Sequence, residues 1–256
     1  LGQDHPSPRD MQAVAADLGL SETVFAARAT EPRLRIFTPE AEIPLAGHPL
    51  VGAAWVLRRA GWIGDAGTLM TAAGPIAVRA DDRGALMTRT GPVHHGQADA
   101  NALAHALGAR ATGPSPIWDV GMPQAMLPVE SLDDLAPDHE ALRSLGRRDG
   151  WAGVSAYVVT ATAGGATTAC VRHFAAPIGI EEDPVTGSAA GALGAALASI
   201  RGHGLDLVVH QGRHVGRPGE VRVHVDWADR GPTSVTIGGA VVPMRAGRVG
   251  PRPLRG

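Results

Sequence analysis

This 256-residue chain contains no lysine, and all 23 of its basic residues are arginine. A pyridoxal-phosphate enzyme needs a lysine for its Schiff base, and a Walker-type phosphate loop needs a lysine for the phosphates. The absence of lysine therefore excludes both classes of protein.

Cysteine is nearly absent as well, since Cys170 is the single one. No intrachain disulfide can form, and a mechanism that uses two thiols is excluded. Cys170 lies in an apolar, strand-like run, so we expect it to pack in the core rather than to act as a nucleophile.

The chain has neither an excess of one charge nor a long hydrophobic run. Its 23 basic and 25 acidic residues give a net charge of −2, which argues against a nucleic-acid or membrane-surface protein. The longest run of small apolar residues, 186–200, is too short to span a bilayer and predicts a buried helix. No secretory signal opens the chain, although it begins with Leu1, so we expect a cytoplasmic protein.

The length suits one large domain or two of ordinary size, and apolar periodicity predicts the elements within it. Helices are expected at 9–20, 50–60, 100–107, 132–145 and 189–200. Strands are expected at 23–26, 34–37, 76–79, 85–88, 125–129, 156–162, 167–174, 205–210, 220–225 and 234–242. The first two strands should form a hairpin, because a polar turn separates them.

Two turn-helix units resemble one another and indicate an internal duplication. Leu45-Ala46-Gly47-His48 and Val185-Thr186-Gly187-Ser188 stand 140 positions apart, with Gly47 matching Gly187. Two helix N-termini aimed at one cleft would supply N–H donors and positive dipole ends for an anionic substrate. A carboxyl group between them could then support enolate-type chemistry without a metal or cofactor.

Four motifs together resemble the PhzF-like family, and the similarity runs from about residue 11 to residue 242. They are Leu20-Ser21-Glu22-Thr23-Val24-Phe25, Arg35-Ile36-Phe37-Thr38-Pro39, Pro44-Leu45-Ala46-Gly47-His48-Pro49 and Gly179-Ile180-Glu181-Glu182-Asp183-Pro184-Val185-Thr186-Gly187-Ser188-Ala189-Ala190-Gly191. The run from Glu182 to Ser188 is the most specific of these.

The resemblance implies an α+β fold of two similar domains, like that of diaminopimelate epimerase. Residues 1–96 and 97–256 would form the two domains, each a mostly antiparallel, barrel-like sheet around a central helix, with the last strand packing back on the first domain. The active site would lie between the domains. The family usually has another strand before the first helix, and this sequence begins after that point, so either the sequence is truncated or this member has lost the strand.

The resemblance also implies a function, that of a cofactor-independent isomerase or epimerase of secondary metabolism that acts as a homodimer on a small carboxylate-bearing substrate. In the family, the acid at the position of Glu22 shuttles a proton. His48, Asp183 and Ser188 match the other polar site residues, and backbone amides near Gly47 and Gly187 would hold the substrate carboxylate. The related diaminopimelate epimerases carry two cysteines at positions that resemble Ala46 and Thr186, so two-thiol epimerisation is not available here.

Each site residue also has an ordinary interpretation. Glu22 could be a solvated residue near a helix end, His48 a turn residue, Asp183 a turn starter and Ser188 a helix N-cap. Two further functions stay open, a non-catalytic protein that binds a small acid and a hydrolase or lyase that uses the same carboxyl group. The remaining histidines lack a tight metal-binding spacing, so no metal is expected.

Overall fold

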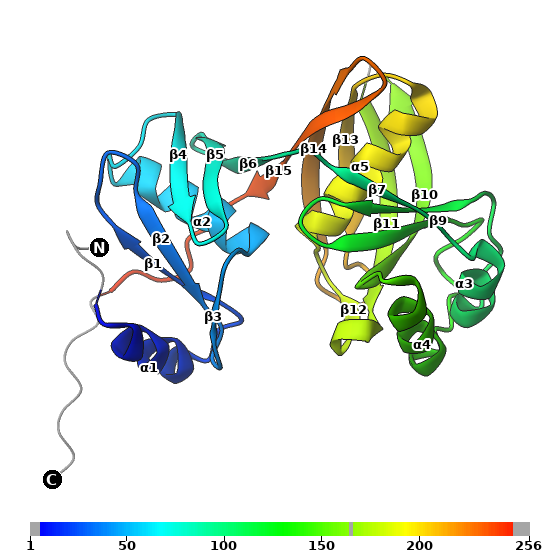
Figure 1. The fold of residues 1–256 in the computed structure, drawn as a ribbon, viewed down its shortest axis with the longest axis horizontal. Coiled ribbons are helices and arrows are strands. Elements are labelled where there is room, and N and C mark those ends of the chain that lie inside the picture. The colour runs from blue at the N-terminus through cyan, green and yellow to red at the C-terminus, as the bar shows by residue number, and fades with distance from the viewer. Residues whose placement is uncertain (1–5, 164–165, 248–256) are drawn as a thin grey trace, which may run out of the picture.

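The computed structural model describes residues 6–163 and 166–247, and Figure 1 shows two lobes joined by strands β6 and β15. The helices are α1 (Pro8–Leu18), α2 (Gly47–Arg59), α3 (Ala100–Leu107), α4 (His139–Asp149) and α5 (Gly187–Arg201), with a 3-10 turn η1 (Ala176–Ile178). The strands of the first lobe are β1 (Thr23–Ala27), β2 (Arg33–Phe37), β3 (Glu42–Ile43), β4 (Ala66–Thr71), β5 (Gly74–Ala80) and β6 (Gly84–Thr90). The later strands are β7 (Val93–Ala98), β8 (Ser115–Asp119), β9 (Pro123–Pro128), β10 (Gly153–Ala163), β11 (Ala166–Ala175), β12 (Ile180–Asp183), β13 (Leu205–Gln211), β14 (Gly219–Ala228) and β15 (Gly231–Ala240).

One continuous hydrogen-bonded path connects the two lobes. Its order is β1-β2-β4-β5-β6-β15-β14-β13-β11-β10-β9-β8-β7, with β3 attached to β2 and β12 to β11. The last strand returns to the first lobe, because β15 pairs antiparallel with β6 from Ser234 opposite Thr90 to Ala240 opposite Gly84. The expected domain boundary between residues 96 and 97 falls inside β7 and stays a prediction.

The expected duplication is visible in the order and pairing of the elements. The run α1-β1-β2-β3-α2-β4-β5-β6 matches the run α4-β10-β11-β12-α5-β13-β14-β15. In both runs the first two strands pair antiparallel, the second strand pairs parallel with the strand after the helix, and the last two pairs are antiparallel. Each half is therefore a mostly antiparallel sheet with one long helix, and the predicted α+β fold of two similar domains is confirmed.

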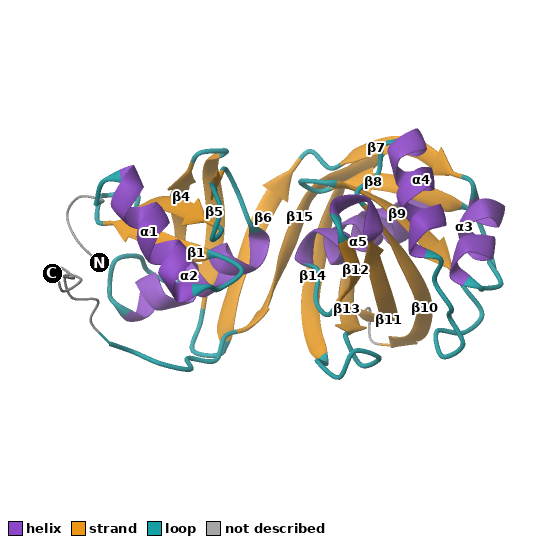
Figure 2. Cartoon of the chain, turned by 90° about the horizontal axis from the view of Figure 1, so that it is seen from below, coloured by secondary structure: helices purple, strands orange, loops and turns teal. Residues whose placement is uncertain are grey.

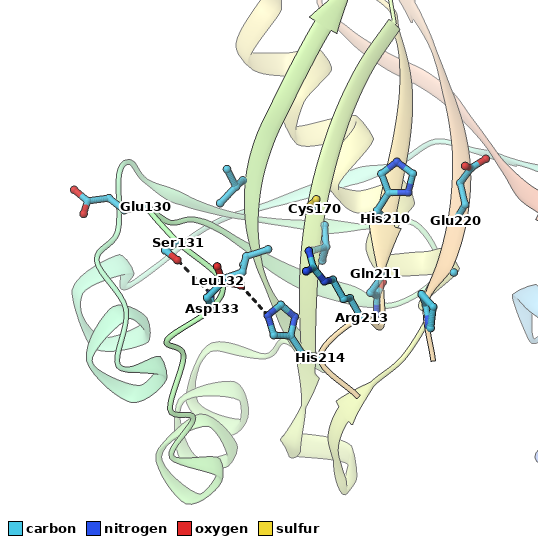
Figure 3. A pocket seen from close by; sticks show the side chains of 14 residues that line it. Glu130, Ser131, Leu132, Asp133, Cys170, His210, Gln211, Arg213, His214 and Glu220 are labelled. Carbon is cyan, nitrogen blue, oxygen red and sulfur yellow. Dashed lines mark hydrogen bonds and ion pairs between the residues drawn. The ribbon is translucent and has the colours of Figure 1, made fainter. Parts of the chain in front are cut away.

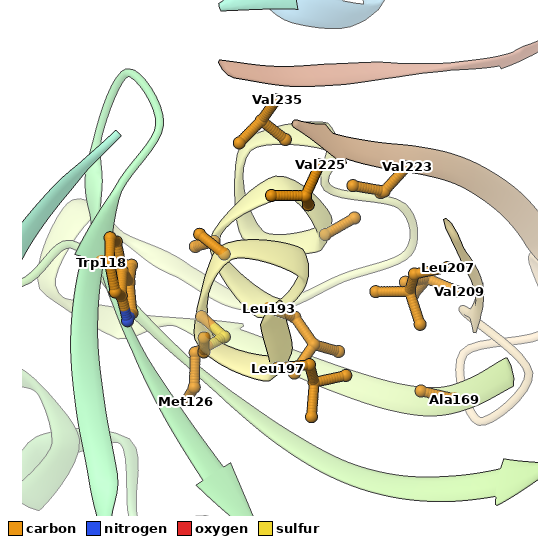
Figure 4. Close-up of a cluster of buried hydrophobic side chains, with 14 of the residues drawn as sticks. Trp118, Met126, Ala169, Leu193, Leu197, Leu207, Val209, Val223, Val225 and Val235 are labelled. Atoms are coloured by element: carbon orange, nitrogen blue, oxygen red, sulfur yellow. The ribbon is translucent and has the colours of Figure 1, made fainter. Parts of the chain in front are cut away.

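A central helix fills each half. In the first half, α2 places Leu50, Ala54 and Leu57 among the apolar side chains of β2, β4, β5 and β6. In the second half, α5 is buried on nearly all sides within the curved sheet (Figure 4), and Leu193 has no exposed surface. Small residues let the strands approach this helix, since a methyl group on Gly194 would lie 2.7 Å from Val223 Cγ1.

Local signals set the helix ends, and two expected helix starts differ from the observed ones by three residues or more. The helix expected at 132–145 begins only at His139, because Pro137 cannot continue a helix and Asp138 caps the amides of Glu140 and Ala141. The helix expected to begin at residue 50 begins three residues earlier, at Gly47. His48 therefore lies inside the first helical turn rather than in the preceding loop. None of the described helices is long and apolar enough to cross a membrane.

Candidate active site

Glu22 and His48 meet where β1 begins and α2 begins. Glu22 directly precedes β1, His48 is the second residue of α2, and α2 contacts β1. Glu22 Oε2 lies 3.1 Å from His48 Nε2, with the Glu22 side chain 18% exposed and the His48 side chain 69% exposed. The contact does not have hydrogen-bond alignment, so this buried Glu22 oxygen has no hydrogen-bond partner within the described ranges. Because nearly all buried polar atoms in proteins have partners, the atom is available to a ligand.

Asp183 and Ser188 lie at the equivalent place in the second half. Asp183 ends β12, and Ser188 is the second residue of α5. The hydroxyl of Thr186, between them, donates a 2.5 Å hydrogen bond to Asp183 Oδ2. The preceding strand is held by Arg172, whose guanidinium binds both carboxylate oxygens of Glu182 at 3.1 and 2.8 Å.

The two helices that open at this site differ from the others in their N-termini. Ser7, Asp99 and Asp138 cap α1, α3 and α4 with their side chains. The N-cap residues of α2 and α5 are Ala46 and Thr186, and neither side chain caps its helix. The first-turn amides of α2 and α5 and the positive ends of their dipoles are therefore open to an anion.

The strand pair that joins the lobes lies between the two central helices (Figure 2), with α2 in contact with β6 and α5 in contact with β15. The nearest atom to a methyl group on Gly47 would be Sδ of Met87, at 4.0 Å, and on Gly187 it would be Cγ2 of Ile237, at 3.6 Å. Met87 and Ile237 are opposite one another in the β6–β15 ladder, and α2 contacts α5. In the part of the chain that the structure describes, no hydrogen bond or ion pair links Glu22 or His48 to Asp183 or Ser188. The site thus consists of two half-sites, and the four roles expected of these residues stay predictions.

A hollow of about 710 Å³ lies on the second lobe beside the Asp183 half-site (Figure 3). Its wall includes Gln211, His210 and Cys170, and none of the four predicted site residues lines it. Cys170 is partly buried and packs against a hydrophobic cluster of the second lobe, as expected. Its neighbours Ala169 and Val171 face the cluster around α5, because residues alternate between the two faces of β11. Within 6–163 and 166–247, no three His, Cys, Asp or Glu side chains are arranged to hold a metal ion.

Sequence motifs assign no role to two polar residues of the second half-site, Thr186 and Gln211. Thr186 lies inside the most specific motif, but its hydroxyl contact with Asp183 needs the folded turn. Gln211 is 25 positions further along the chain, at the end of β13, and donates to the carbonyl oxygen of Asp183. Its only sign in the sequence is a polar residue that ends an apolar strand.

Comparisons with known proteins identify the family of the chain. The family model described as phenazine biosynthesis-like protein, PhzC-PhzF, matches residues 1–247. An uncharacterized isomerase of Deinococcus radiodurans is 35% identical over 266 residues, which cover 93% of this chain and 83% of the relative. The trans-2,3-dihydro-3-hydroxyanthranilate isomerase of Pseudomonas aeruginosa is 32% identical over 96% of this chain and 90% of its own length. The crystal structure of a PhzF-family phenazine biosynthesis protein of Bacillus anthracis matches with a TM-score of 0.77 and 26% identity, over 92% of this chain and 86% of that one.

Proposed function

This chain belongs to the PhzC-PhzF family and is an isomerase, and we propose that it moves a proton on a small carboxylate-bearing substrate with Glu22 as acid and base. The observation that carries the proposal is the Glu22 carboxyl group beside the α2 N-terminus: its buried Oε2 makes no hydrogen bond in the described part of the chain and lies 3.1 Å from His48 Nε2. The Pseudomonas aeruginosa relative is named for a substrate that is a small carboxylic acid, and this agrees with two open helix N-termini.

In the proposed reaction, the carboxylate of Glu22 removes a proton from a carbon of the substrate. The C–H electron pair stays on the substrate as an enolate-type anion, and the new O–H bond is on Glu22. Glu22 then donates a proton, which exchanges with solvent while it is on the carboxyl group, to a second carbon; this gives the isomer, and neither an oxidant nor a reductant is consumed. General acid–base catalysis of this kind contributes on the order of 10² to 10⁴ in rate.

The other groups support this step by binding and polarising the substrate. First-turn amides of α2 and α5, at Gly47 and Gly187, would hold the substrate carboxylate, and the hydroxyl of Ser188 would donate to it. His48 is 3.1 Å from Glu22 and would orient that carboxyl group or exchange a proton with the substrate. Asp183, which the Thr186 hydroxyl holds in place, would contact a polar group of the substrate from the other half-site.

Solvent-deuterium wash-in tests the proposal. The protein is incubated in D₂O with trans-2,3-dihydro-3-hydroxyanthranilate and with a panel of other small carboxylic acids, and deuterium in recovered substrate and product is measured by NMR and mass spectrometry. Glu22→Gln should abolish incorporation while preserving the fold. Glu31→Gln is the matched control, because Glu31 is exposed in the turn between β1 and β2, and it should leave incorporation unchanged.

Several outcomes would contradict the assignment. Wash-in that survives Glu22→Gln would exclude Glu22 as the proton carrier. Stabilisation by a carboxylate without any proton exchange would instead support a binding protein, and a product of new mass would indicate a hydrolase or lyase. The homodimer implied by the family resemblance stays a prediction, which light scattering on the purified protein tests.

A further inference from the structure

Gln211 holds the turn that carries Asp183 into the second half-site. Its side chain is buried, with 3% of the residue exposed. Its Nε2 donates to the carbonyl oxygen of Asp183 at 2.7 Å and to Thr186 Oγ1 at 3.2 Å. Its Oε1 accepts from the backbone amide of Thr186 at 3.3 Å. All of these hydrogen bonds go to Asp183, the last residue of β12, and to Thr186, the N-cap residue of α5.

The sheet explains why Gln211 reaches this turn. On one edge of β11, β10 pairs as far as Phe174. On the other edge, β13 ends with Gln211 opposite Val171, and β12 continues with Asp183 opposite His173. The ends of β12 and β13 therefore lie end to end along one edge of β11, two residues apart. This places the Gln211 amide directly beside the turn that leaves β12.

The direction of the hydrogen bonds fixes the Asp183 carboxyl group. The side-chain amide nitrogen of Gln211, Nε2, can donate hydrogen bonds but cannot accept them. The Thr186 hydroxyl must therefore accept the hydrogen bond from Gln211. That hydroxyl then directs its own proton to Asp183 Oδ2, at 2.5 Å. The chain of donors runs from Gln211 through Thr186 to Asp183.

We propose that Gln211 is a positioning residue for the reaction, which acts through Thr186 to hold Asp183 in its working orientation. The inference rests on the proposed function, because it takes Asp183 to be a substrate-contacting group. The first half has no counterpart of this chain of hydrogen bonds, because the residue equivalent to Thr186 is Ala46, which carries no hydroxyl. The chain of hydrogen bonds from Gln211 through Thr186 is therefore specific to the Asp183 half-site.

Gln211→Glu is the sharpest test, because it preserves size and shape but exchanges a donor for an acceptor. Glutamate at this position still accepts from the Thr186 amide, but it can no longer donate to the carbonyl oxygen of Asp183 or to the Thr186 hydroxyl. The Thr186 hydroxyl can now donate to the new carboxylate, and Asp183 loses its donor. We expect kcat for trans-2,3-dihydro-3-hydroxyanthranilate to fall by about 10- to 100-fold, with KM within about threefold, because small misplacements of a catalytic group cost this much.

Gln12→Glu provides the matched control. Gln12 also holds a loop by donating to two backbone carbonyls, those of Thr38 and Pro39, each at 3.0 Å. Its loop contains none of the predicted site residues, so kcat should stay within about twofold of the unaltered protein. Thr186→Val should reproduce the Gln211→Glu loss, and the double variant should be no slower than Thr186→Val alone. An unchanged kcat in Gln211→Glu, or losses that multiply in the double variant, would overturn the proposal.

A measurement without substrate separates failure of this inference from failure of the proposed function. Hydrogen exchange at the Thr186 amide should be about tenfold faster in Gln211→Leu, which lacks the acceptor, and unchanged in Gln211→Glu. No wash-in by the unaltered protein would contradict the proposed function alone. The exchange measurement would then decide on Gln211, and unchanged Thr186 exchange in Gln211→Leu would overturn its positioning role.

Discussion

His173 lies opposite Asp183 in the β11–β12 ladder, so a buried imidazole is directly across from a candidate active-site carboxyl group. The residue is 1% exposed, and its Nδ1 lies 3.0 Å from Ser155 Oγ. Burial lowers the pKa of His173 from its ordinary 6.5 to about 4, although the charge of Asp183 acts in the opposite direction. His173 is therefore neutral in the folded protein near pH 7.

This burial predicts a loss of stability in mild acid. Between about pH 6.5 and pH 4 the unfolded chain binds a proton on His173 that the folded chain does not bind. Stability therefore falls as the pH falls through this window, by about 3 kcal/mol when the loss is complete. Urea unfolding at pH 7 and pH 4.5, for the unaltered protein and His173→Gln, checks it. The variant should lose about 2 kcal/mol less over this interval, and equal pH dependence of the two proteins would contradict the prediction.

Glu182→Gln should destabilise the fold by about 2 to 3 kcal/mol. The ion pair with Arg172 is largely buried, with the two side chains 11% and 12% exposed, so removing the carboxylate leaves an unpaired buried charge. Glu140→Gln is the control, because the Glu140–Arg143 pair is exposed and worth less than about 0.5 kcal/mol. Chemical denaturation measures both variants. Equal effects of the two substitutions would show that burial does not matter here.

Two helical glycines should respond to alanine with opposite signs. A methyl group on Gly146 in α4 would lie 2.3 Å from Pro177 Cγ and 2.9 Å from the carbonyl oxygen of Trp151, both in rigid groups. Gly146→Ala should therefore cost about 1 to 3 kcal/mol despite the better helix propensity of alanine. A methyl group on Gly52 in α2 meets no atom within 4 Å, so Gly52→Ala should stabilise by about 0.5 to 1 kcal/mol. Thermal unfolding of both variants distinguishes these signs.

His48→Gln should lower kcat/KM by about 100-fold with little effect on stability. The His48 side chain is 69% exposed, so its loss removes little packing, whereas its ring lies 3.1 Å from Glu22. Initial rates with the substrate that the wash-in panel identifies, together with the melting temperature, check both parts. His105→Gln, on the exposed side of α3, should change neither value. Full activity of His48→Gln would remove His48 from the proposed mechanism.

Elements with a clear apolar pattern could be predicted from the sequence, whether long or short, but strands without such a pattern could not. The helix expected at 100–107 has the same bounds in the structure, because Asp99 caps it and Gly108 ends it in the left-handed region. Strand β8 contains Pro116, which argues against a strand, and β7 contains His94, His95 and Gly96 without apolar alternation. These strands form because partners from distant parts of the chain pair with them.

The candidate site divides in a similar way. The motifs predicted His48, Asp183 and Ser188 because these residues are close in sequence to the two helix starts, whereas Glu22 lies far from α2 in sequence and was assigned by the family resemblance. They could not predict the Glu22–His48 contact from spacing alone, since it depends on how α2 packs on β1. The role of Gln211 could not be predicted from the sequence either, because only the parallel pairing of β13 with β11 brings this residue to the turn.

The bare N-termini of α2 and α5 have a practical consequence for identifying the substrate. An uncapped helix forgoes about 1 kcal/mol that a Ser or Asp cap would supply, and a bound anion can restore it. Sulfate, acetate or phosphate in a buffer would then raise the melting temperature through ordinary binding linkage, as a true substrate would. Thermal-shift screens of this protein should therefore use buffers poor in small anions, and a positive result should be followed by an assay of proton exchange.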